Sequence, residues 1–267
     1  MTPALLEAIG VSKTFAPRER WGGGVRAAVA AVHEVTLALR TGETIGLVGE
    51  SGCGKTTLAK LLVGLTAPSA GEVLMQGRPL RRLRGPELLK ARRSVQMIFQ
   101  DPMNSLNPRM TVEETLAEPL LIHRVAGDRR ARIQALLESV RLSAAYRSRL
   151  PRELSGGERQ RIGIARALAV EPDALLCDEP IASLDVSVGA QIVELLRALA
   201  RERRMALLFI SHDIRAVASL CERIVVMRQG RLVEDAPTDQ LLAKPCDPYT
   251  ALLLRSAALD LDAVPAL

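Results

Sequence analysis

The stretch Gly49-Glu50-Ser51-Gly52-Cys53-Gly54-Lys55-Thr56 decides the fold of this 267-residue chain. It matches the pattern G-x-x-x-x-G-K-[ST], in which glycines let successive backbone N–H groups turn inward around phosphate oxygens. The apolar run 44–48 precedes it, and an amphipathic helix is expected from Lys55 onward. Strand, loop and helix in this order predict a phosphate-binding loop at a helix N-terminus. An ordinary glycine-rich turn that caps a helix is the alternative interpretation.

The residues of this loop have separate expected roles. Lys55 would reach the β- and γ-phosphates of a nucleotide, and the Thr56 hydroxyl would bind Mg²⁺. The whole expected phosphate-binding set consists of Gly49, Glu50, Ser51, Gly52, Cys53, Gly54, Lys55, Thr56 and Thr57.

Composition excludes several classes of protein. The chain has 36 Lys and Arg against 30 Asp and Glu, and its 48% hydrophobic content excludes a disordered chain. Only 2% of residues are aromatic, so the core must consist of Leu, Val, Ile and Ala. No apolar run approaches the roughly 18 residues of a membrane span, and no secretory signal opens the chain. The cysteines, Cys53, Cys177, Cys221 and Cys246, form no CxxC pair, so we expect a reduced, cytoplasmic protein without disulfides.

Short apolar runs alternate with helical segments, which is typical of a mainly parallel sheet with helices on its faces. Buried strands are expected at 44–48, 94–99, 174–177 and 206–210. Other expectations are an antiparallel flank before Leu39, a helical segment from Val112 to about Arg152, a hairpin around 228–230 and a short helix after Pro248.

Two carboxylates follow one of these strands. The run 174–177 ends at Asp178 and Glu179, and the carboxyl ends of parallel strands are where ligands bind. We expect Asp178 to lie near a metal ion and Glu179 to polarise an attacking water. Taken alone, an acidic turn after a buried strand is the commoner interpretation. Together with the phosphate loop, the pair predicts a site of nucleotide hydrolysis.

A second glycine-rich run indicates the family. Leu154-Ser155-Gly156-Gly157-Glu158, followed by the helical run 159–168, resembles the signature of the ATP-binding-cassette (ABC) ATPases. The usual fifth residue of that signature is Gln, and Glu158 departs from it. Further positions resemble the family in order: Gln100 the Q-loop glutamine, Ser183-Leu184-Asp185 the D-loop, and His212 the switch histidine. Phe15 is the expected adenine-stacking aromatic, with Trp21 as the competitor.

The resemblance, which covers about Leu5 to Leu254, implies an α/β P-loop NTPase. Its RecA-like parallel-sheet core carries an antiparallel β flank and a helical subdomain. The expected boundaries are 1–99 for the flank and first part of the core with the phosphate loop, 100–165 for the Q-loop, helical subdomain and signature, 166–235 for the second part of the core, and 236–267 for a C-terminal helical tail.

The resemblance also implies ATP and Mg²⁺ as cofactors and a head-to-tail dimer. Ser155 and Gly157 of one subunit would contact the γ-phosphate held by the other subunit's phosphate loop. The implied catalytic residues are Glu179, His212 and Gln100; the metal-binding residues are Thr56, Gln100 and Asp178; and further nucleotide-binding residues are Phe15, Ser155, Gly156, Gly157, Glu158 and Asp185.

Within the family, the runs 100–112 and 247–253 resemble the peptide/nickel importer group. This implies the ATP-hydrolysing subunit of a bacterial importer of nickel, metal chelates or short peptides, peripheral on the cytoplasmic face of the inner membrane. The implied partners are two multi-span permease subunits, a second copy or a related ABC ATPase and, indirectly, an extracytoplasmic solute-binding protein; no nucleic acid is expected. The permease's coupling helix would dock near the segment after Gln100.

The cargo and the type of assembly have alternatives. The short segment after Pro-Tyr-Thr and the isolated Cys246 favour nickel or a metal chelate over peptides. Two other functions stay open by analogy: the ATPase of a soluble assembly, such as the phosphonate-degrading complex, and a non-transport ABC ATPase acting on ribosomes or DNA. Co-purification with membrane proteins distinguishes both from an importer.

Overall fold

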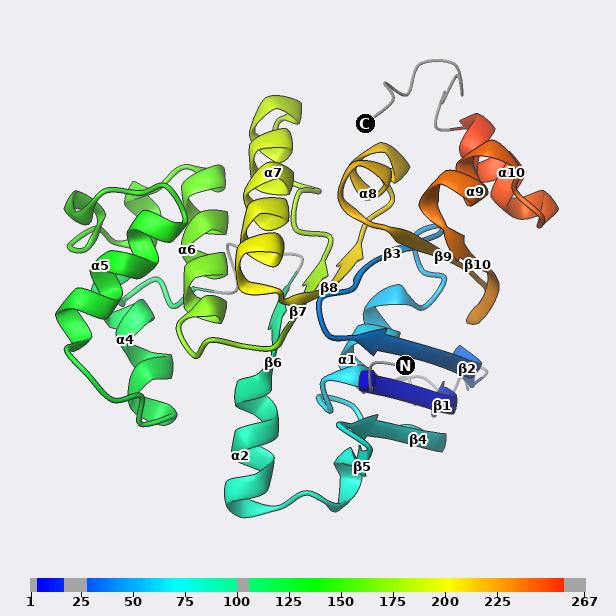
Figure 1. The fold of residues 1–267 in the computed structure, drawn as a ribbon, viewed down its shortest axis with the longest axis horizontal. Helices are drawn as coiled ribbons and strands as arrows, with labels where there is room; N and C mark the ends of the chain where they lie inside the picture. Colours follow the sequence, from blue (N-terminus) through cyan, green and yellow to red (C-terminus); the bar gives the residue numbers. More distant parts are fainter. Residues whose placement is uncertain (1–3, 17–27, 100–105, 257–267) are drawn as a thin grey trace, which may run out of the picture. The chain divides into compact units, whose positions relative to one another are not determined.

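The computed structural model describes residues 4–16, 28–99 and 106–256. Contacts divide the chain into two compact units, each assembled from segments that are distant in the sequence. The first unit consists of Met1–Arg40, Ile45–Leu83 and His212–Leu267, and the second of Thr41–Thr44 and Arg84–Ser211. Figure 1 traces both along the sequence.

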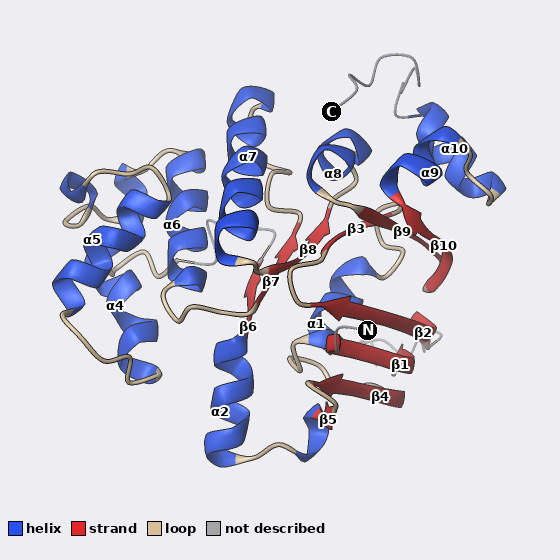
Figure 2. Ribbon diagram, viewed as in Figure 1, coloured by secondary structure: helices blue, strands red, loops and turns tan. Residues whose placement is uncertain are grey.

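An antiparallel sheet belongs to the first unit, with strand order β2-β1-β4-β5 (Figure 2). Its strands are β1 (Ala4–Phe15), β2 (Val29–Arg40), β4 (Ala70–Met75) and β5 (Arg78–Pro79). Alternate side chains of β2, namely Val35, Leu37 and Leu39, are buried, as expected for a strand with one face against a core. The antiparallel flank predicted from the sequence is therefore confirmed.

The first unit also holds part of the parallel sheet. Strand β3 (Thr44–Val48) pairs in parallel with β9 (Arg223–Arg228), which pairs antiparallel with β10 (Arg231–Pro237). All five residues of β3 are buried, which explains its unbroken apolar sequence. The helices of this unit are α1 (Lys55–Leu62), α8 (Ile214–Leu220), α9 (Thr238–Ala243) and α10 (Pro248–Ser256).

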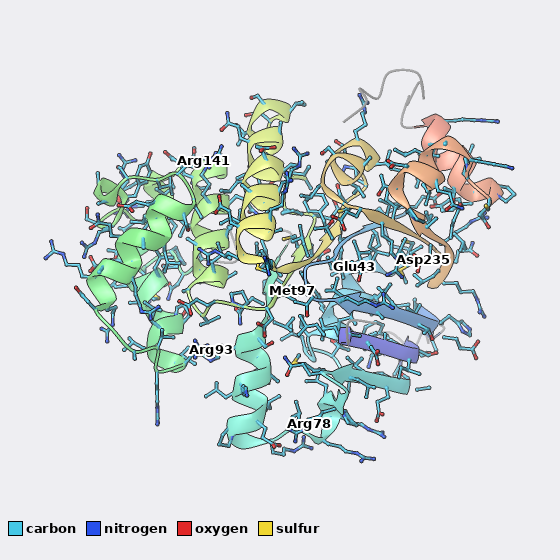
Figure 3. All side chains as sticks on the ribbon, in the orientation of Figure 1. Glu43, Arg78, Arg93, Met97, Arg141 and Asp235 are labelled. Carbon is cyan, nitrogen blue, oxygen red and sulfur yellow. The ribbon has the colours of Figure 1, made fainter. Side chains whose placement is uncertain are left out.

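The predicted hairpin is the β9–β10 connection. Gln229 and Gly230 both have positive φ, 47° and 81°, which suits a two-residue turn between twisted antiparallel strands. Across the hairpin, Arg223 Nε and Nη2 each donate to Asp235 at 2.6 Å. Asp235 is labelled on β10 in Figure 3. This bidentate pair and the turn together determine the register of the two strands.

The second unit contains three parallel strands in the order β8-β7-β6. These are β6 (Val95–Ile98), β7 (Ala174–Asp178) and β8 (Ala206–Ile210), and the last two are buried throughout. One predicted boundary is wrong: Ser94 ends helix α2 (Gly85–Ser94) and does not begin the strand. Its carbonyl still accepts from the Asp173 N–H at 2.8 Å, and its hydroxyl donates to the Asp173 carboxylate at 2.5 Å, so the last residue of α2 is already hydrogen-bonded to the segment that leads into β7.

The segment predicted to be helical from Val112 to about Arg152 is helical in the structure, as a series of short elements. It consists of α4 (Val112–Ile122), α5 (Arg129–Ser139) and short 3₁₀ turns at Ala144–Tyr146 and Pro151–Glu153. Arg124 and Arg141 have left-handed φ of 50° and 60° just after α4 and α5, so the chain reverses there. The helices α6 (Gly156–Leu168) and α7 (Val186–Arg203) complete this unit.

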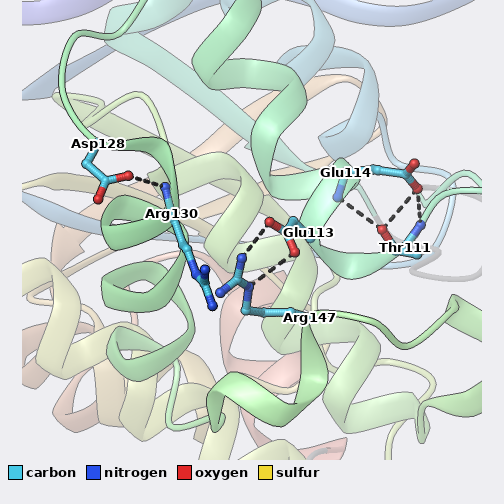
Figure 4. Close-up of polar contacts among 6 residues, drawn as sticks. All are labelled: Thr111, Glu113, Glu114, Asp128, Arg130 and Arg147. Carbon is cyan, nitrogen blue, oxygen red and sulfur yellow. Dashed lines mark hydrogen bonds and ion pairs between the residues drawn. The ribbon is translucent and has the colours of Figure 1, made fainter.

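Side-chain caps hold the start of α4 (Figure 4). Thr111 Oγ1 accepts from the Glu114 N–H at 3.2 Å, while Glu114 Oε2 accepts from the Thr111 N–H at 2.7 Å. This reciprocal pair satisfies two donors that a helix N-terminus leaves unpaired. Beside it, Arg147 forms an ion pair with Glu113 at 2.5 Å, which ties the segment after α5 back to α4.

Both cores are aliphatic, as the composition predicted. The buried side chains are mainly Leu, Val, Ile and Ala, and Phe209 on β8 is fully buried. Within the described ranges, no helix combines the length and the apolar character needed to cross a membrane.

A prediction concerns Gly46, in the middle of β3. A Cβ there would lie 2.0 Å from Val217 Cγ1 on α8, so Gly46→Ala forces a helix of this core to shift. We expect a loss of about 1–3 kcal/mol in unfolding free energy, measured by urea denaturation. Val217→Ala removes the clashing atom and leaves the nearest neighbours at 3.4 and 3.5 Å.

The double variant should therefore lose less stability than the sum of the two single variants. Additive losses, or a Gly46→Ala protein as stable as the wild type, would contradict this packing.

Candidate functional site

The glycine-rich loop joins β3 to α1 in the first unit. Gly49, Gly52 and Gly54 have φ of 152°, 80° and 114°, backbone conformations that residues with a Cβ rarely adopt. Gly54 is the N-cap of α1, so the helix begins directly at Lys55. The loop therefore presents its last N–H groups along the start of a helix, the arrangement that attracts anions.

Close backbone contacts also require these glycines. A Cβ on Gly49 would lie 2.1 Å from the Met227 carbonyl oxygen, and one on Gly54 would lie 2.1 Å from that of Ala31. The Gly230 N–H donates to the Cys53 carbonyl at 2.9 Å. The loop thus lies between β2 and the β9–β10 turn. Its glycines are required because there is no room for a Cβ, as well as for their backbone conformations.

Lys55 is a buried cation at the centre of this loop. Only 5% of the residue is exposed. Its Nζ donates to the Gly49 and Glu50 carbonyls at 2.7 and 2.9 Å and lies 3.9 Å from Cys53 Sγ. Within the part of the chain that the structure describes, no carboxylate pairs with it. A buried ammonium group is costly without a counter-charge, so this site is suited to an anion.

The acidic residues lie at the end of β7 in the second unit. Asp178 is the last residue of the strand and is 1% exposed, and in the parallel register it stands opposite Ile210. Glu179 follows in a left-handed conformation with φ of 50°, and its N–H donates to the Ile210 carbonyl at 2.9 Å. The strand end is therefore bent sharply at the residue expected to orient water.

Ser155 is the N-cap of α6, and Glu158 completes a capping box with it. The Ser155 Oγ accepts from the Glu158 N–H at 3.3 Å, and Glu158 Oε2 accepts from the Ser155 N–H at 2.7 Å. Because the serine oxygen accepts in this box, its own hydroxyl hydrogen is available to a ligand.

Glu158 has a second partner, Tyr146, which sequence analysis did not single out. The Tyr146 hydroxyl donates to Glu158 Oε1 at 2.5 Å, and the Arg149 guanidinium lies 4.3 Å from the tyrosine ring centroid. The Tyr146 hydrogen bond, followed by that from the Ser155 backbone, lowers the pKa of Glu158. Glu158 is consequently ionised at neutral pH, and it adds a negative charge to the first turn of α6.

The two signature glycines allow α6 to approach α7 closely. A Cβ on Gly157 would lie 2.5 Å from Val188 Cγ1, and one on Gly156 would lie 3.3 Å from Leu184 Cδ2. Asp185 is the N-cap residue of α7 but forms no capping hydrogen bond. The predicted signature and D-loop are therefore in direct contact within the second unit.

The remaining predicted residues are spread over the first unit or fall outside the described residues. Phe15 ends β1, is 45% exposed, and lies 5.3 Å from Lys13 Nζ. His212 is exposed, just before the Asp213 cap of α8. Thr56 and Thr57 are half-buried on α1. Gln100 and Trp21 lie outside the described residues.

All four cysteines are free thiols. Burial raises the pKa of the Cys53 thiol despite its proximity to Lys55, so Cys53 is a neutral, small residue of the loop.

Tyr249 belongs to the site, although its position in the sequence does not indicate this. The Glu50 N–H donates to the Tyr249 hydroxyl at 3.1 Å, across 199 residues of chain. In the sequence, the Asp-Pro-Tyr-Thr run resembles the peptide/nickel importer group and carries no sign of a contact with the phosphate loop. No local pattern connects it to the phosphate loop.

The strand–loop–helix unit around Lys55 and the buried parallel strands define the class: an α/β fold of the P-loop nucleotide-binding type. A sequence model described as ABC transporter matches residues 32–182. The chain belongs to the ABC transporter family, and it is an ATPase of that family.

Relatives agree with this assignment over most of the chain. The oligopeptide transport ATP-binding protein OppF of Bacillus subtilis is 48% identical, over 88% of this chain and 78% of that protein. A probable peptide ABC transporter ATP-binding protein, y4tS of Sinorhizobium fredii, is 45% identical over 96% of this chain and 73% of its own length. OppF of Escherichia coli is 45% identical over 86% and 70%.

Solved structures confirm the predicted fold class. A dimeric, post-hydrolysis structure of the ATP-binding cassette MJ0796, bound to ADP and Pi, has a TM-score of 0.75 at 30% identity and covers 87% of this chain and 98% of that one. CbiO1 of Clostridium perfringens, at 24% identity, has a TM-score of 0.76 over 97% and 96% and shows the fold alone.

A prediction concerns the Tyr146–Glu158 bond and pH. The folded-state pKa of Glu158 is lowered, so its contribution to stability is present above the unfolded carboxyl value of about 4.3 and is lost as pH falls through the folded value. Tyr146→Phe should therefore lower the urea midpoint at pH 7, and the difference from wild type should narrow towards pH 4.

The control is the same substitution in a Glu158→Gln background, which has no carboxyl group at position 158. There the effect of Tyr146→Phe on the urea midpoint should not vary with pH. If Tyr146→Phe lowers the urea midpoint of the otherwise wild-type protein equally at pH 7 and pH 4, this would argue against a hydrogen bond to an ionised Glu158.

Proposed function

We propose that this chain hydrolyses ATP by in-line attack of water on the γ-phosphate bound in its phosphate loop. The observation that carries the proposal is Lys55, a buried ammonium group with backbone carbonyls but no carboxylate around it among the described residues. The γ- and β-phosphates supply the missing counter-charge, and the positive N-terminal end of α1 adds to their binding.

Mg²⁺ fits the residues available. Thr56 is the second residue of α1, directly after Lys55, and Asp178 is a buried carboxylate at a strand end. Hydroxyl and carboxylate oxygens are donors that Mg²⁺ prefers, and Gln100 would add an amide oxygen. When bound, the ion offsets negative charge on the phosphates.

The chain's own residues act on the water and the γ-phosphate. Glu179 orients the attacking water or accepts its proton, and His212 contacts the γ-phosphate. Phe15 or Trp21 stacks on adenine. Ser155, Gly156 and Gly157 of a second subunit donate to the γ-phosphate, since a capped serine hydroxyl and free helix N–H groups suit an anion. The dimeric structure of MJ0796 supports a dimer as the working form.

The ATPase proposal is tested with Lys55→Met, which keeps the length of the side chain and removes its charge. ATP affinity and turnover should fall by at least about 100-fold, while the thermal midpoint without nucleotide stays equal or rises, because an unpaired buried charge is gone. Lys60→Met, on the last turn of the same helix, is the matched control and should retain both. Wild-type ATP binding in Lys55→Met would overturn the proposal.

Glu179→Gln separates binding from chemistry in the same assay. It keeps a hydrogen-bonding side chain but cannot accept a proton, so ATP should still bind while hydrolysis slows by about 100-fold or more. The stalled protein should elute as an ATP-bound dimer in size-exclusion chromatography. Unchanged turnover would remove Glu179 from the mechanism.

We further propose that hydrolysis powers import of short peptides through separate membrane subunits, at the cytoplasmic face of the membrane. The names of the relatives, OppF and y4tS among them, support peptides as cargo. The expected nickel or metal-chelate cargo has no support from these relatives. The partner subunits are two multi-span permeases and a second cassette ATPase, with a solute-binding protein acting through the permeases.

A groove in the second unit suits the permease. It has a volume of about 690 Å³ and lies along α4 and α5, with Glu113, Glu114 and Glu118 in its lining. Leu121 and Ile122, also in the lining, are 53% and 56% exposed. Because Glu113 is paired with Arg147 and Glu114 caps α4, and because Arg129 also lines the groove, the apolar strip is its main feature for a partner. An exposed apolar strip in a groove suits a short amphipathic helix, which is what a cytoplasmic loop of a permease can offer.

The importer proposal is tested by affinity purification from membranes of the native cell. Wild-type protein should recover two multi-span proteins, and Leu121→Gln with Ile122→Gln should lose them while basal ATPase activity persists. Leu65→Gln, equally exposed at 57% but in the first unit, is the matched control and should recover them. Recovery of ribosomal or soluble enzyme subunits instead would overturn the transport role.

A further inference from the structure

The peptide group between Gly49 and Glu50, at the start of the phosphate loop, is held from two sides. Its carbonyl oxygen accepts from Lys55 Nζ at 2.7 Å, and its N–H donates to the Tyr249 hydroxyl at 3.1 Å. Glycine at position 49 imposes little barrier to rotation of this peptide, because it has no Cβ. The two hydrogen bonds therefore help to fix the direction in which this peptide points, together with the backbone packing of the loop.

The two bonds differ in what a bound nucleotide asks of them. In the proposed function the three N–H donors of Lys55 are shared between the loop carbonyls and the phosphates. The Tyr249 hydroxyl is the side-chain partner of the Gly49–Glu50 peptide that has no such second task. The orientation of the loop in the ATP-bound state thus depends on a residue of the C-terminal helix.

Tyr249 is itself firmly positioned. It is 4% exposed, and the Arg228 guanidinium at the end of β9 lies 4.7 Å from its ring centroid. Its N–H donates to Asp247 Oδ1 at 2.7 Å, at the start of α10. The N–H groups of Cys246 and Asp247 donate to the Glu234 carboxylate on β10 at 2.8 and 3.1 Å. Strand β10 therefore anchors the helix start that carries the tyrosine.

The next residue shows that a hydroxyl on this helix does not automatically find a partner. Thr250 is fully buried, and its Oγ1 has no hydrogen-bond partner in the described part of the chain. Burial raises the pKa of Tyr249, so its phenol is neutral at physiological pH and accepts the Glu50 N–H as an uncharged group. The hydroxyls of Tyr249 and Thr250 are both buried and adjacent in the chain, but only the Tyr249 hydroxyl, of these two, is hydrogen-bonded to the phosphate loop.

We propose that Tyr249 is a positioning residue for ATP binding, and that its hydroxyl holds the Gly49–Glu50 peptide in the orientation that the phosphates require. The inference rests on the proposed function of the loop. It makes the C-terminal helix, which lies beyond the matched family segment 32–182, a working part of the nucleotide site.

The test is Tyr249→Phe, which keeps the ring and its contact with Arg228 and removes only the acceptor oxygen. Without that oxygen, the Glu50 amide should exchange its hydrogen at least about tenfold faster in the nucleotide-free protein, as measured by NMR. The KM for ATP should rise by about five- to tenfold with kcat within about twofold, since the loop is mispositioned for binding and not for chemistry.

Thr250→Val is the matched control. It removes a buried hydroxyl from the adjacent position of the same helix, so any general loosening of α10 should affect it equally. We expect its KM, kcat and Glu50 exchange rate to equal those of the wild type, and its thermal midpoint to stay equal or rise. The thermal midpoint of Tyr249→Phe should remain within a few degrees of wild type.

Two results would overturn the inference. One is a Tyr249→Phe protein whose Glu50 exchange and KM are unchanged; the other is an equal rise of KM in Thr250→Val, which would indicate packing alone. Failure of the proposed function is distinguishable, because it is read from the wild type: a wild-type protein that binds no ATP overturns both, whereas ATP binding that needs Lys55 but not the Tyr249 hydroxyl overturns only the inference.

Discussion

A buried ammonium group that lacks a carboxylate partner among the described residues is the constraint around which the first unit is organised. Lys55 can be buried only where backbone carbonyls or a ligand anion surround it, so the chain must bring a glycine-rich loop with accessible carbonyls to that point. Gly49 and Gly54 have no Cβ, which leaves room for the carbonyls of Met227 and Ala31 to pack against the loop. Strands β2, β3 and β9 therefore position the phosphate loop as well as contributing to the core.

In the second unit, the positive N-terminus of α6 already has a negatively charged side chain beside it. The start of α6 is a positive helix end that would attract phosphate, yet Glu158 already places an ionised carboxylate in its first turn. Hydrogen bonds from Tyr146 and the Ser155 N–H stabilise the ionised carboxylate. The replacement of the usual Gln by Glu158 is therefore accommodated by a local network, and the serine hydroxyl and glycine N–H groups remain available for an anion.

Much of the fold was predictable because its signals are local. Strands such as Thr44–Val48 and Ala206–Ile210 are continuous apolar runs, and the two-residue turn at Gln229 and Gly230 has its own turn chemistry. Ser94 ends α2 although its carbonyl already accepts from the Asp173 N–H, so helix and sheet meet at this residue, and no local pattern marks the exact boundary. The helical character predicted from Val112 to about Arg152 is confirmed, whereas the breaks within it were not predicted, because left-handed residues such as Arg124 carry no obvious sequence signal.

The sequence by itself determined the phosphate loop, the acidic strand end and the glycine-rich start of α6, because each is a contiguous run whose chemistry depends on spacing along the chain. Only the tertiary structure decided what supports those runs. Tyr146 reaches Glu158 from a separate turn, and Tyr249 reaches Glu50 across 199 residues. A hydrogen bond depends on the distance between two atoms in space, and when chain closure sets that distance, no local pattern records it.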